Sequence, residues 1–183
     1  APMCGMQTGK YPRIVAKLLA GSCCLLGKRK CFASLAGQRG FSDIPQFEGS
    51  SCTSKERYDY MFQKRLLDEH YRTYGGSYGW VLAGLRASRK LMRKENLAKI
   101  KTPVLLFAAG HDHMVDNDAI ERFAELTNRT ELFFMPDSRH EIFNADERTR
   151  TKYYDEIFRF IKEEEVKDYE NENEQTRKIL GTV

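Results

Sequence analysis

The stretch from Pro103 to His140 decides the fold, and it reads PVLLFAAGHDHMVDNDAIERFAELTNRTELFFMPDSRH. It opens with an apolar run, residues 103–110, that is long enough for a strand buried on both faces and is stopped by Gly110. Apolar residues at helical spacing follow over 118–126, and a second strand is expected over 130–135. The stretch therefore predicts a strand, a helix and a second strand, with the two strands adjacent and parallel.

Polar side chains follow each of these strands. Asp112 comes two residues after the glycine that ends the first strand, and His140 comes after the second strand. Because the carboxyl ends of parallel strands share one edge of a sheet, both side chains should lie on that edge, where an acid can orient a histidine that takes a proton from a hydroxyl. Asp116 is the alternative acid, and Asn117 or Asp118 is expected to cap the helix.

The rest of the chain is predicted to be mainly helical, without a further strand in the main sheet before residue 95. Helices are expected over 12–26, 55–72, 80–93 and 147–164, with an irregular, glycine- and serine-rich loop over 33–54. We predict three regions: a helical cap over 1–95, the strand-containing region over 96–164, and a charged, disordered tail over 165–183. The cap helices carry apolar residues that could line an acyl-chain site: Tyr58, Phe62, Trp80 and Leu85.

The fold class is therefore α/β, but two strands and their helices do not close a core on their own. The chain begins with Ala1 and has no positively charged, apolar leader typical of a secretory signal. We interpret the chain as a piece of a longer protein that supplies further strands.

Charge and cysteine content indicate which ligands the chain is expected to bind and which it is not. The formal net charge is +4, and the excess of base lies in the first hundred residues. This pattern is typical of solvated helix faces or of attraction to anionic lipid headgroups, whereas no nucleic-acid-binding module accompanies it. The five cysteines form no paired spacing and predict free thiols in a reducing compartment. No second cluster of ligands accompanies His111 and His113, so neither a metal site nor another cofactor is predicted.

Residues 75–79, GGSYG, match the G-x-S-x-G pattern of a nucleophile elbow, with Ser77 at its centre. An elbow needs a buried strand that runs directly into the serine, and the preceding residues, DEHYRTY, are too polar for one. A turn between two cap helices is the better interpretation of this segment.

Several segments together resemble the bacterial lysophospholipases of the serine α/β-hydrolase superfamily, which are relatives of the monoacylglycerol lipases. The resemblance covers about residues 1–162, is strongest over 97–140, and rests on these segments: APM (1–3), GMQTG (5–9), LAKIKTPVLL (97–106) and VDN (115–117). It implies that Asp112 is the acid and His140 the base of a catalytic triad. It also implies that six strands, the nucleophilic serine and the oxyanion hole belong to a missing amino-terminal half.

The expected function is hydrolysis of the acyl ester of a single-chain lipid, a lysophospholipid or a monoacylglycerol, by a Ser-His-Asp mechanism. The chain alone, which lacks the serine, should be inactive. The expected location is cytoplasmic, with peripheral binding to the anionic inner membrane as a further option. The alternative is a non-catalytic fragment or a module that binds lipid surfaces or a partner. The presence or absence of an upstream G-x-S-x-G after a buried strand distinguishes the two.

Overall fold

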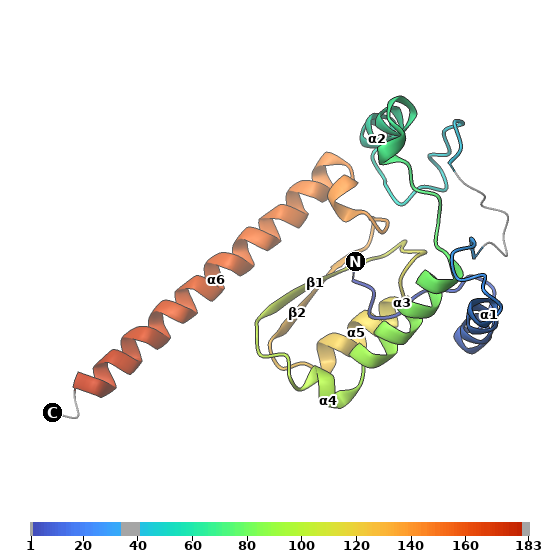
Figure 1. Cartoon of the computed structure of the whole chain (residues 1–183). Coiled ribbons are helices and arrows are strands. Elements are labelled where there is room, and N and C mark those ends of the chain that lie inside the picture. Colours follow the sequence, from blue (N-terminus) through green and yellow to red (C-terminus); the bar gives the residue numbers. More distant parts are fainter. Residues whose placement is uncertain (1, 34–40, 181–183) are drawn as a thin grey trace.

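A computed structural model describes residues 2–33 and 41–180 of the chain (Figure 1). Three predicted features lie partly outside the described residues. They are the APM segment at Ala1, the irregular loop at 34–40 and the tail at 181–183. The elements follow in the order α1 (Arg13–Leu25), α2 (Lys55–Leu67), the 3-10 helix η1 (Glu69–Tyr71), α3 (Tyr78–Leu91), α4 (Lys94–Leu97), β1 (Val104–Ala109), α5 (Asn117–Glu125), β2 (Thr130–Met135), the 3-10 helix η2 (Ile142–Asn144) and α6 (Glu147–Leu180).

The predicted pair of strands is confirmed. β1 and β2 are parallel neighbours, and their register runs from Val104 opposite Thr130 to Ala109 opposite Met135. The two strands therefore end side by side, and the loops that follow them leave from the same edge of the sheet. The described part of residues 10–95 contributes helices and turns but no strand to this sheet.

Both faces of β1 are covered, which explains its uninterrupted apolar sequence. In Figure 1, α5 lies on one side of the two strands and α6 on the other. The core on the α5 side includes Leu106, Ala108, Ile120, Phe123 and Leu97. The core on the α6 side includes Phe107, Ala109, Met135 and Ile142, with Tyr153 and Ile157 packed against it.

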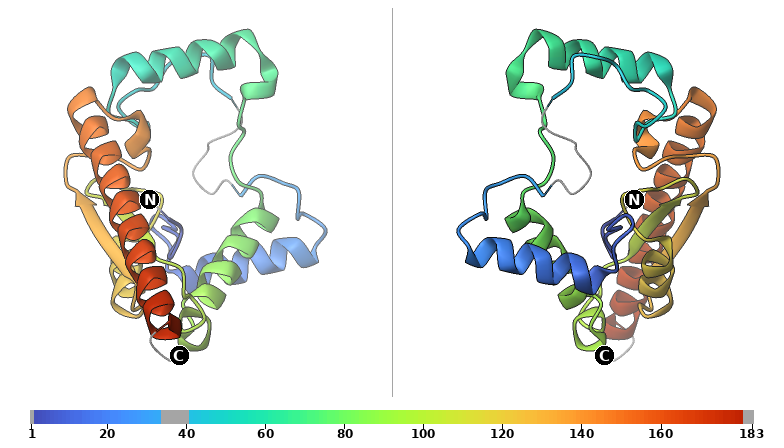
Figure 2. Two further views of the ribbon diagram at one scale, coloured as in Figure 1. Left: turned by 90° about the vertical axis from the view of Figure 1, so that its left-hand side faces the viewer. Right: turned by 90° about the vertical axis from the view of Figure 1, so that its right-hand side faces the viewer.

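The first residues of the chain contact both α3 and the loop that follows β1. α1 packs along α3, whereas α2 stands apart from the sheet in both views of Figure 2. The Ser88 hydroxyl of α3 donates a hydrogen bond of 3.0 Å to the carbonyl of Met3. At Gly84 a Cβ atom would lie only 2.4 Å from the terminal methyl of Met6, so α3 and the Met6 side chain pack closely at this point.

The helix predicted over 55–72 ends at Leu67, and a 3-10 helix over Glu69–Tyr71 follows it. The helices differ from the prediction in three further respects. Neither Asn117 nor Asp118 caps α5: Asp116 occupies the N-cap position without a side-chain cap hydrogen bond, and the Asn117 amide donates to the carbonyl of Ala109 at 2.8 Å. Trp80 is 53% exposed, since its ring packs over Gly76 at the start of α3 and not in the core.

The third difference concerns the end of the chain. α6 continues past residue 164 to Leu180, where a disordered tail is predicted from residue 165. Glu, Lys, Arg and Gln have high helix propensity, and pairs such as Lys167 with Glu164 support the helix surface. The boundary between cap and core at residue 95 stays a prediction.

Candidate catalytic site

The two loops that leave the sheet edge are hydrogen-bonded to each other where they start. The backbone amide of Gly110 donates to the carbonyl of Met135 at 2.9 Å, and the amide of His111 donates to the carbonyl of Ser138 at 2.9 Å. The Ser138 side chain is fully buried and its hydroxyl donates to the same Met135 carbonyl at 2.9 Å. These bonds fix the start of one loop relative to the other.

Gly110 is required by the closeness of the two loops. A Cβ atom at this position would lie 2.1 Å from the backbone oxygen of Pro136. Every residue other than glycine would therefore push the loops apart at the point where they begin.

Asp112 and His140 meet at this edge. The Nδ1 atom of His140 lies 2.8 Å from Oδ2 of Asp112, within the range of 2.6–3.2 Å expected for such a pair. The Asp112 side chain is 0% exposed, whereas that of His140 is 24% exposed. With the Nδ1 proton donated to the carboxylate, Nε2 of His140 is left to accept a proton from a hydroxyl group.

The second oxygen of Asp112 is held by its own loop. Oδ1 accepts hydrogen bonds from the backbone amides of Met114, at 2.8 Å, and Val115, at 3.0 Å. Burial alone would raise the pKa of Asp112, but the Val115 amide, the His140 ring and the Met114 amide together hold that pKa below its usual value. Asp112 is therefore a charged carboxylate that can stabilise a protonated His140.

Asp116, the alternative acid, points to a different partner. Its carboxylate forms an ion pair with the guanidinium of Arg13 at the start of α1, and Arg13 also donates to the carbonyl of Met6 at 3.1 Å. The backbone amide of Asp116 donates to Gly5 at 2.9 Å, and Met6 pairs with Val115 in an antiparallel bridge. Asp116 thus ties the first residues of the chain to the loop that carries Asp112.

Ser77 caps a helix in the cap region. Its hydroxyl accepts a hydrogen bond of 3.2 Å from the amide of Trp80 at the start of α3. The described residues before it, 72–76, form no strand, and Ser77 itself pairs with Phe32 in an isolated bridge. This geometry matches the interpretation of Ser77 as part of a turn.

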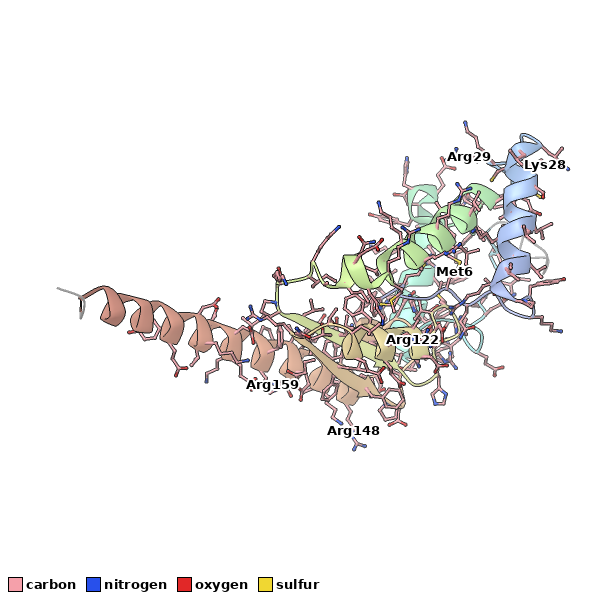
Figure 3. The ribbon with its side chains drawn as sticks, turned by 90° about the horizontal axis from the view of Figure 1, so that it is seen from below. Met6, Lys28, Arg29, Arg122, Arg148 and Arg159 are labelled. Carbon is pink, nitrogen blue, oxygen red and sulfur yellow. The ribbon has the colours of Figure 1, made fainter. Side chains whose placement is uncertain are left out.

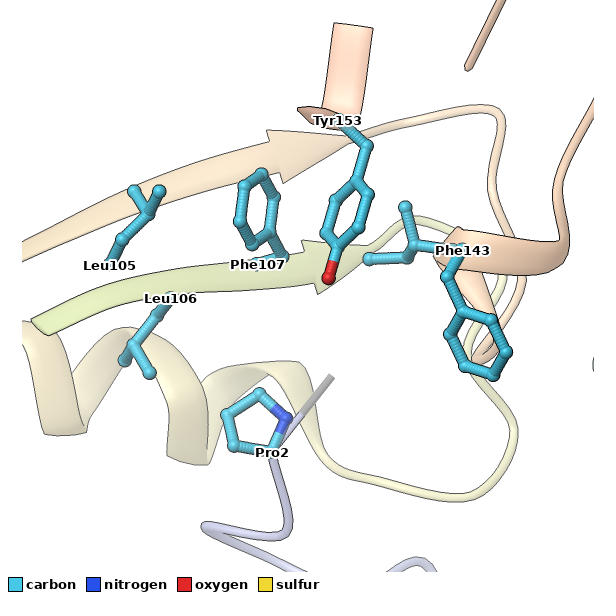
Figure 4. Close-up of a pocket in the computed structure, with 7 residues that line it drawn as sticks. Pro2, Leu105, Leu106, Phe107, Phe143 and Tyr153 are labelled. Carbon is cyan, nitrogen blue, oxygen red and sulfur yellow. The ribbon is translucent and has the colours of Figure 1, made fainter. Parts of the chain in front are cut away.

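The four residues predicted to line an acyl-chain site are not brought together. Phe62 and Leu85 are buried on different helices, Tyr58 stacks on Phe62, and Trp80 is exposed. A cavity of about 180 Å³ lies instead beside β1 (Figure 4). It is lined by Pro2, Leu105, Leu106, Phe107, Ile142, Phe143 and Tyr153. Because successive residues of a strand face opposite sides, the lining by Leu105, Leu106 and Phe107 places this cavity along an edge of β1.

Sequence reasoning missed several residues that hold this site. Arg13, and also Arg139, whose guanidinium contacts the carbonyls of Phe47 and Cys52, have no sequence pattern that sets them apart from other surface arginines. The backbone amides that hold Asp112 cannot be read from side chains at all. Gly110 is the exception, since a glycine directly after a buried strand is a recognisable sign of close backbone approach.

Comparisons with known proteins bear on the family and the fold. Residues 1–147 match the family model described as serine aminopeptidase, S33. No protein with a curated function matches the chain. Among solved structures, a soluble variant of monoglyceride lipase from Saccharomyces cerevisiae superposes with a TM-score of 0.60 at 18% identity, covering 88% of this chain and 53% of the lipase. The monoacylglycerol lipase of Paleococcus ferrophilus gives a TM-score of 0.52 at 15% identity, covering 88% of this chain and 56% of that one.

These structural matches show the fold, and the chain spans little more than half the length of the two lipases. The fold class predicted from the sequence, a part of an α/β-hydrolase, is confirmed. The family model covers most of the chain, including both Asp112 and His140. The chain therefore belongs to the serine aminopeptidase S33 family of α/β-hydrolases.

Proposed function

We propose that the complete protein hydrolyses the acyl ester of a single-chain lipid, of the lysophospholipase or monoacylglycerol lipase type. The observation that carries this proposal is the hydrogen bond between the buried carboxylate of Asp112 and Nδ1 of the partly exposed His140. The family membership and the two lipases among the similar structures support a lipid ester as the substrate class.

In the proposed mechanism, Nε2 of His140 takes the proton of a serine hydroxyl as that serine attacks the ester carbonyl. His140 then protonates the leaving glycerol oxygen, and the cycle repeats with water to release the fatty acid. Asp112 keeps the imidazole in the tautomer with its proton on Nδ1 and stabilises the charged form. The serine itself is proposed to lie in a segment upstream of residue 1.

Two features support an upstream half of the same fold as the partner of this chain. Within the described residues the sheet consists of β1 and β2 alone, which leaves one edge of β1 without a strand. The apolar cavity of Figure 4 follows an edge of β1. A further strand would satisfy the free backbone groups and cover this apolar surface.

The test is to join the chain to an amino-terminal half from a family member that carries the serine, and to measure hydrolysis of monoacylglycerol and lysophospholipid. We expect His140→Ala to lower kcat by about three orders of magnitude or more, and Asp112→Asn to lower it by about 10⁴. Asp116→Asn is the matched control and should cost much less. If Asp116→Asn were the more damaging change, the acid assignment would be wrong.

The isolated chain gives a second check. We expect it to show no ester hydrolysis above background. Turnover that disappears in Ser77→Ala would contradict the proposal that the nucleophile lies upstream.

A second proposed property is contact with an anionic membrane surface, in a cytoplasmic protein. Apolar side chains on α1 point to solvent: Ile14 is 69% exposed, Leu18 67% and Leu25 90%. Basic residues follow at the end of this helix, where Figure 3 labels Lys28 and Arg29. Over the described ranges, no helix combines the length and the hydropathy needed to cross a bilayer.

This apolar face with adjacent basic residues also favours the alternative, a non-catalytic module that binds lipid surfaces. Co-sedimentation with vesicles of anionic and of neutral lipid tests the contact, and stronger binding to the anionic vesicles is expected. Binding without turnover in the joined protein would favour the alternative over the hydrolase.

A further inference from the structure

Residues 47–54, which we call the cap strap, connect the cap to the loop that carries His140. The guanidinium of Arg139, next to His140 in the chain, accounts for most of this connection. Its Nη1 atom, which carries two hydrogens, lies within hydrogen-bond distance of three carbonyl oxygens of the strap: Phe47 at 3.1 Å, Ser50 at 3.2 Å and Cys52 at 3.1 Å. The Ser50 hydroxyl lies 3.5 Å from the same nitrogen. The backbone amide of Glu141 adds a hydrogen bond of 2.8 Å to the carbonyl of Ser51.

The strap also contacts η2, which follows the His140 loop, and the loop that carries Asp112. The thiol of Cys52, which is 4% exposed, donates to the carbonyl of Asn144 at 2.8 Å. The Ser51 hydroxyl lies 3.3 Å from the sulfur of Met114, whose amide holds Asp112. The strap therefore touches both loops that leave the sheet edge.

From the strap the contacts continue to α2. The Arg139 guanidinium lies over the Phe47 ring, with 5.7 Å between the guanidinium carbon and the ring centroid. The Phe47 ring meets the edge of Tyr58 at a centroid distance of 5.4 Å, and Tyr58 stacks on Phe62 at 5.9 Å. The amide of Gln46 donates to the Tyr58 hydroxyl at 2.6 Å. A continuous series of contacts thus links the neighbour of His140 to a cap helix that stands away from the sheet.

We infer that Arg139 is a positioning residue that fastens the cap strap to the His140 loop and so keeps His140 aligned on Asp112. One cation lies among three backbone carbonyls that belong to a segment without regular structure, and its two Nη1 hydrogens are shared between them. Without it the Ser50 carbonyl loses its donor, the Phe47 and Cys52 carbonyls keep only their bonds from the amide and the hydroxyl of Ser50, and the strap loses its charged attachment to the His140 loop. Because Arg139 and His140 are adjacent in the chain, a strap that moves also displaces the imidazole.

The reactivity of the Cys52 thiol can be used to measure whether the strap stays bound to the His140 loop. Burial raises the pKa of the Cys52 thiol and also that of Cys4, which is 3% exposed in the core beside α5. Both thiols should therefore react slowly with N-ethylmaleimide in the unaltered chain. Labelling rates resolved for each cysteine by peptide mass spectrometry report opening of the strap at Cys52 and opening of the core at Cys4.

The test compares Arg139→Gln with Arg148→Gln, a control whose exposed arginine points away from the protein (Figure 3). In Arg139→Gln we expect Cys52 to react about tenfold faster or more, because hydrogen bonds to a charged group are lost, while Cys4 is unchanged. Arg148→Gln should leave both rates unchanged. A Cys52 rate within about twofold of the unaltered chain would overturn the proposed fastening.

The effect on His140 needs its own measurement. The NMR signal of the His140 Nδ1 proton, shared with Asp112, should broaden or shift in Arg139→Gln and stay in place in Arg148→Gln. An unchanged signal alongside a faster Cys52 would overturn the positioning role, because Arg139 would then hold the cap alone. The importance of Arg139 for catalysis rests on the proposed function. The cysteine labelling rates and the NMR signal are measured without turnover, so they can contradict the role of Arg139 whether or not the complete protein is a hydrolase.

A second variant covers the case in which Arg139→Gln loosens the whole fold and speeds Cys4 and Cys52 equally. Arg139→Lys keeps the charge but lacks the planar group that donates to several carbonyls and stacks on Phe47. Selective acceleration at Cys52 in this variant supports the inference. No acceleration, or equal acceleration at both cysteines, overturns it.

Discussion

The strand-containing region and the cap are built in opposite ways. In the first, β1, α5 and β2 follow one another directly, and β1 is buried between α5 and α6. In the cap, α1 exposes large apolar side chains, and α2 is linked to the histidine loop by the cap strap. The comparison shows that a local pattern specifies the first region, whereas a few contacts between distant residues hold the second. We therefore expect the two regions to differ in stability and in tolerance to substitution.

The largest effect is expected at the junction of the two site loops. Gly110→Ala should destabilise the chain by more than about 4 kcal/mol, because its Cβ would lie 2.1 Å from a backbone oxygen. Urea unfolding followed by circular dichroism measures this loss. Gly49→Ala in the cap strap is the control, since a Cβ there meets nothing within 4 Å. Similar values for both variants would show that the loops can separate freely.

A core and a cap residue can be compared directly. Ile120→Ala in α5, where the side chain is 0% exposed, should cost about 3–4 kcal/mol. Phe62→Ala in α2 should cost less than about 2 kcal/mol, because the cap can open without unfolding the sheet region. The same unfolding measurement applies to both. Equal losses would mean that cap and sheet region unfold as one unit.

Acid should weaken the sheet region through Asp112. Its pKa is lower in the folded chain than in the unfolded chain, so its contribution is present above the unfolded value of about 3.9 and is lost as the pH falls through the folded value. At pH 7, Asp112→Asn should cost about 1.5–3 kcal/mol, the usual worth of hydrogen bonds to a charged group. This variant should also show a flatter loss of stability in acid.

The control for this prediction is Asp68→Asn. Asp68 pairs with His70 in the cap, but its side chain is 46% exposed, so its removal should change the acid profile little. An acid profile of Asp112→Asn that equals that of the unaltered chain would contradict the proposed role of the buried carboxylate.

The smallest effect on stability is expected on the outer face of α1. Leu18→Lys should change the unfolding free energy by less than about 0.5 kcal/mol, because this side chain is 67% exposed. Ala20→Lys on the inner face, where the side chain is 2% exposed, should be strongly destabilising. If Leu18→Lys also weakens binding to anionic vesicles, the face contacts lipid through its apolar side chains. Unchanged vesicle binding would contradict that role.

The sequence by itself determined the strand, helix and strand of residues 103–135 and the placement of Asp112 and His140 at one sheet edge. These follow from the apolar period and from the rule that parallel strands end on the same side. All five cysteines are free, as their odd count and spacing predict. The strands and the helix follow from local pattern, so no contact between distant side chains was needed to predict them.

Only the tertiary structure decided the partners of the site residues. Asp116 bonds to Arg13, Asp112 is held by two backbone amides, and Arg139 fastens the cap strap. The contacts of Asp116 and Arg139 join segments that are distant in the chain, and those of Asp112 depend on the backbone shape of its own loop, which side-chain type and spacing do not encode. The exposure of Trp80 has the same origin, because burial depends on which surfaces come together and not on the hydropathy of one residue.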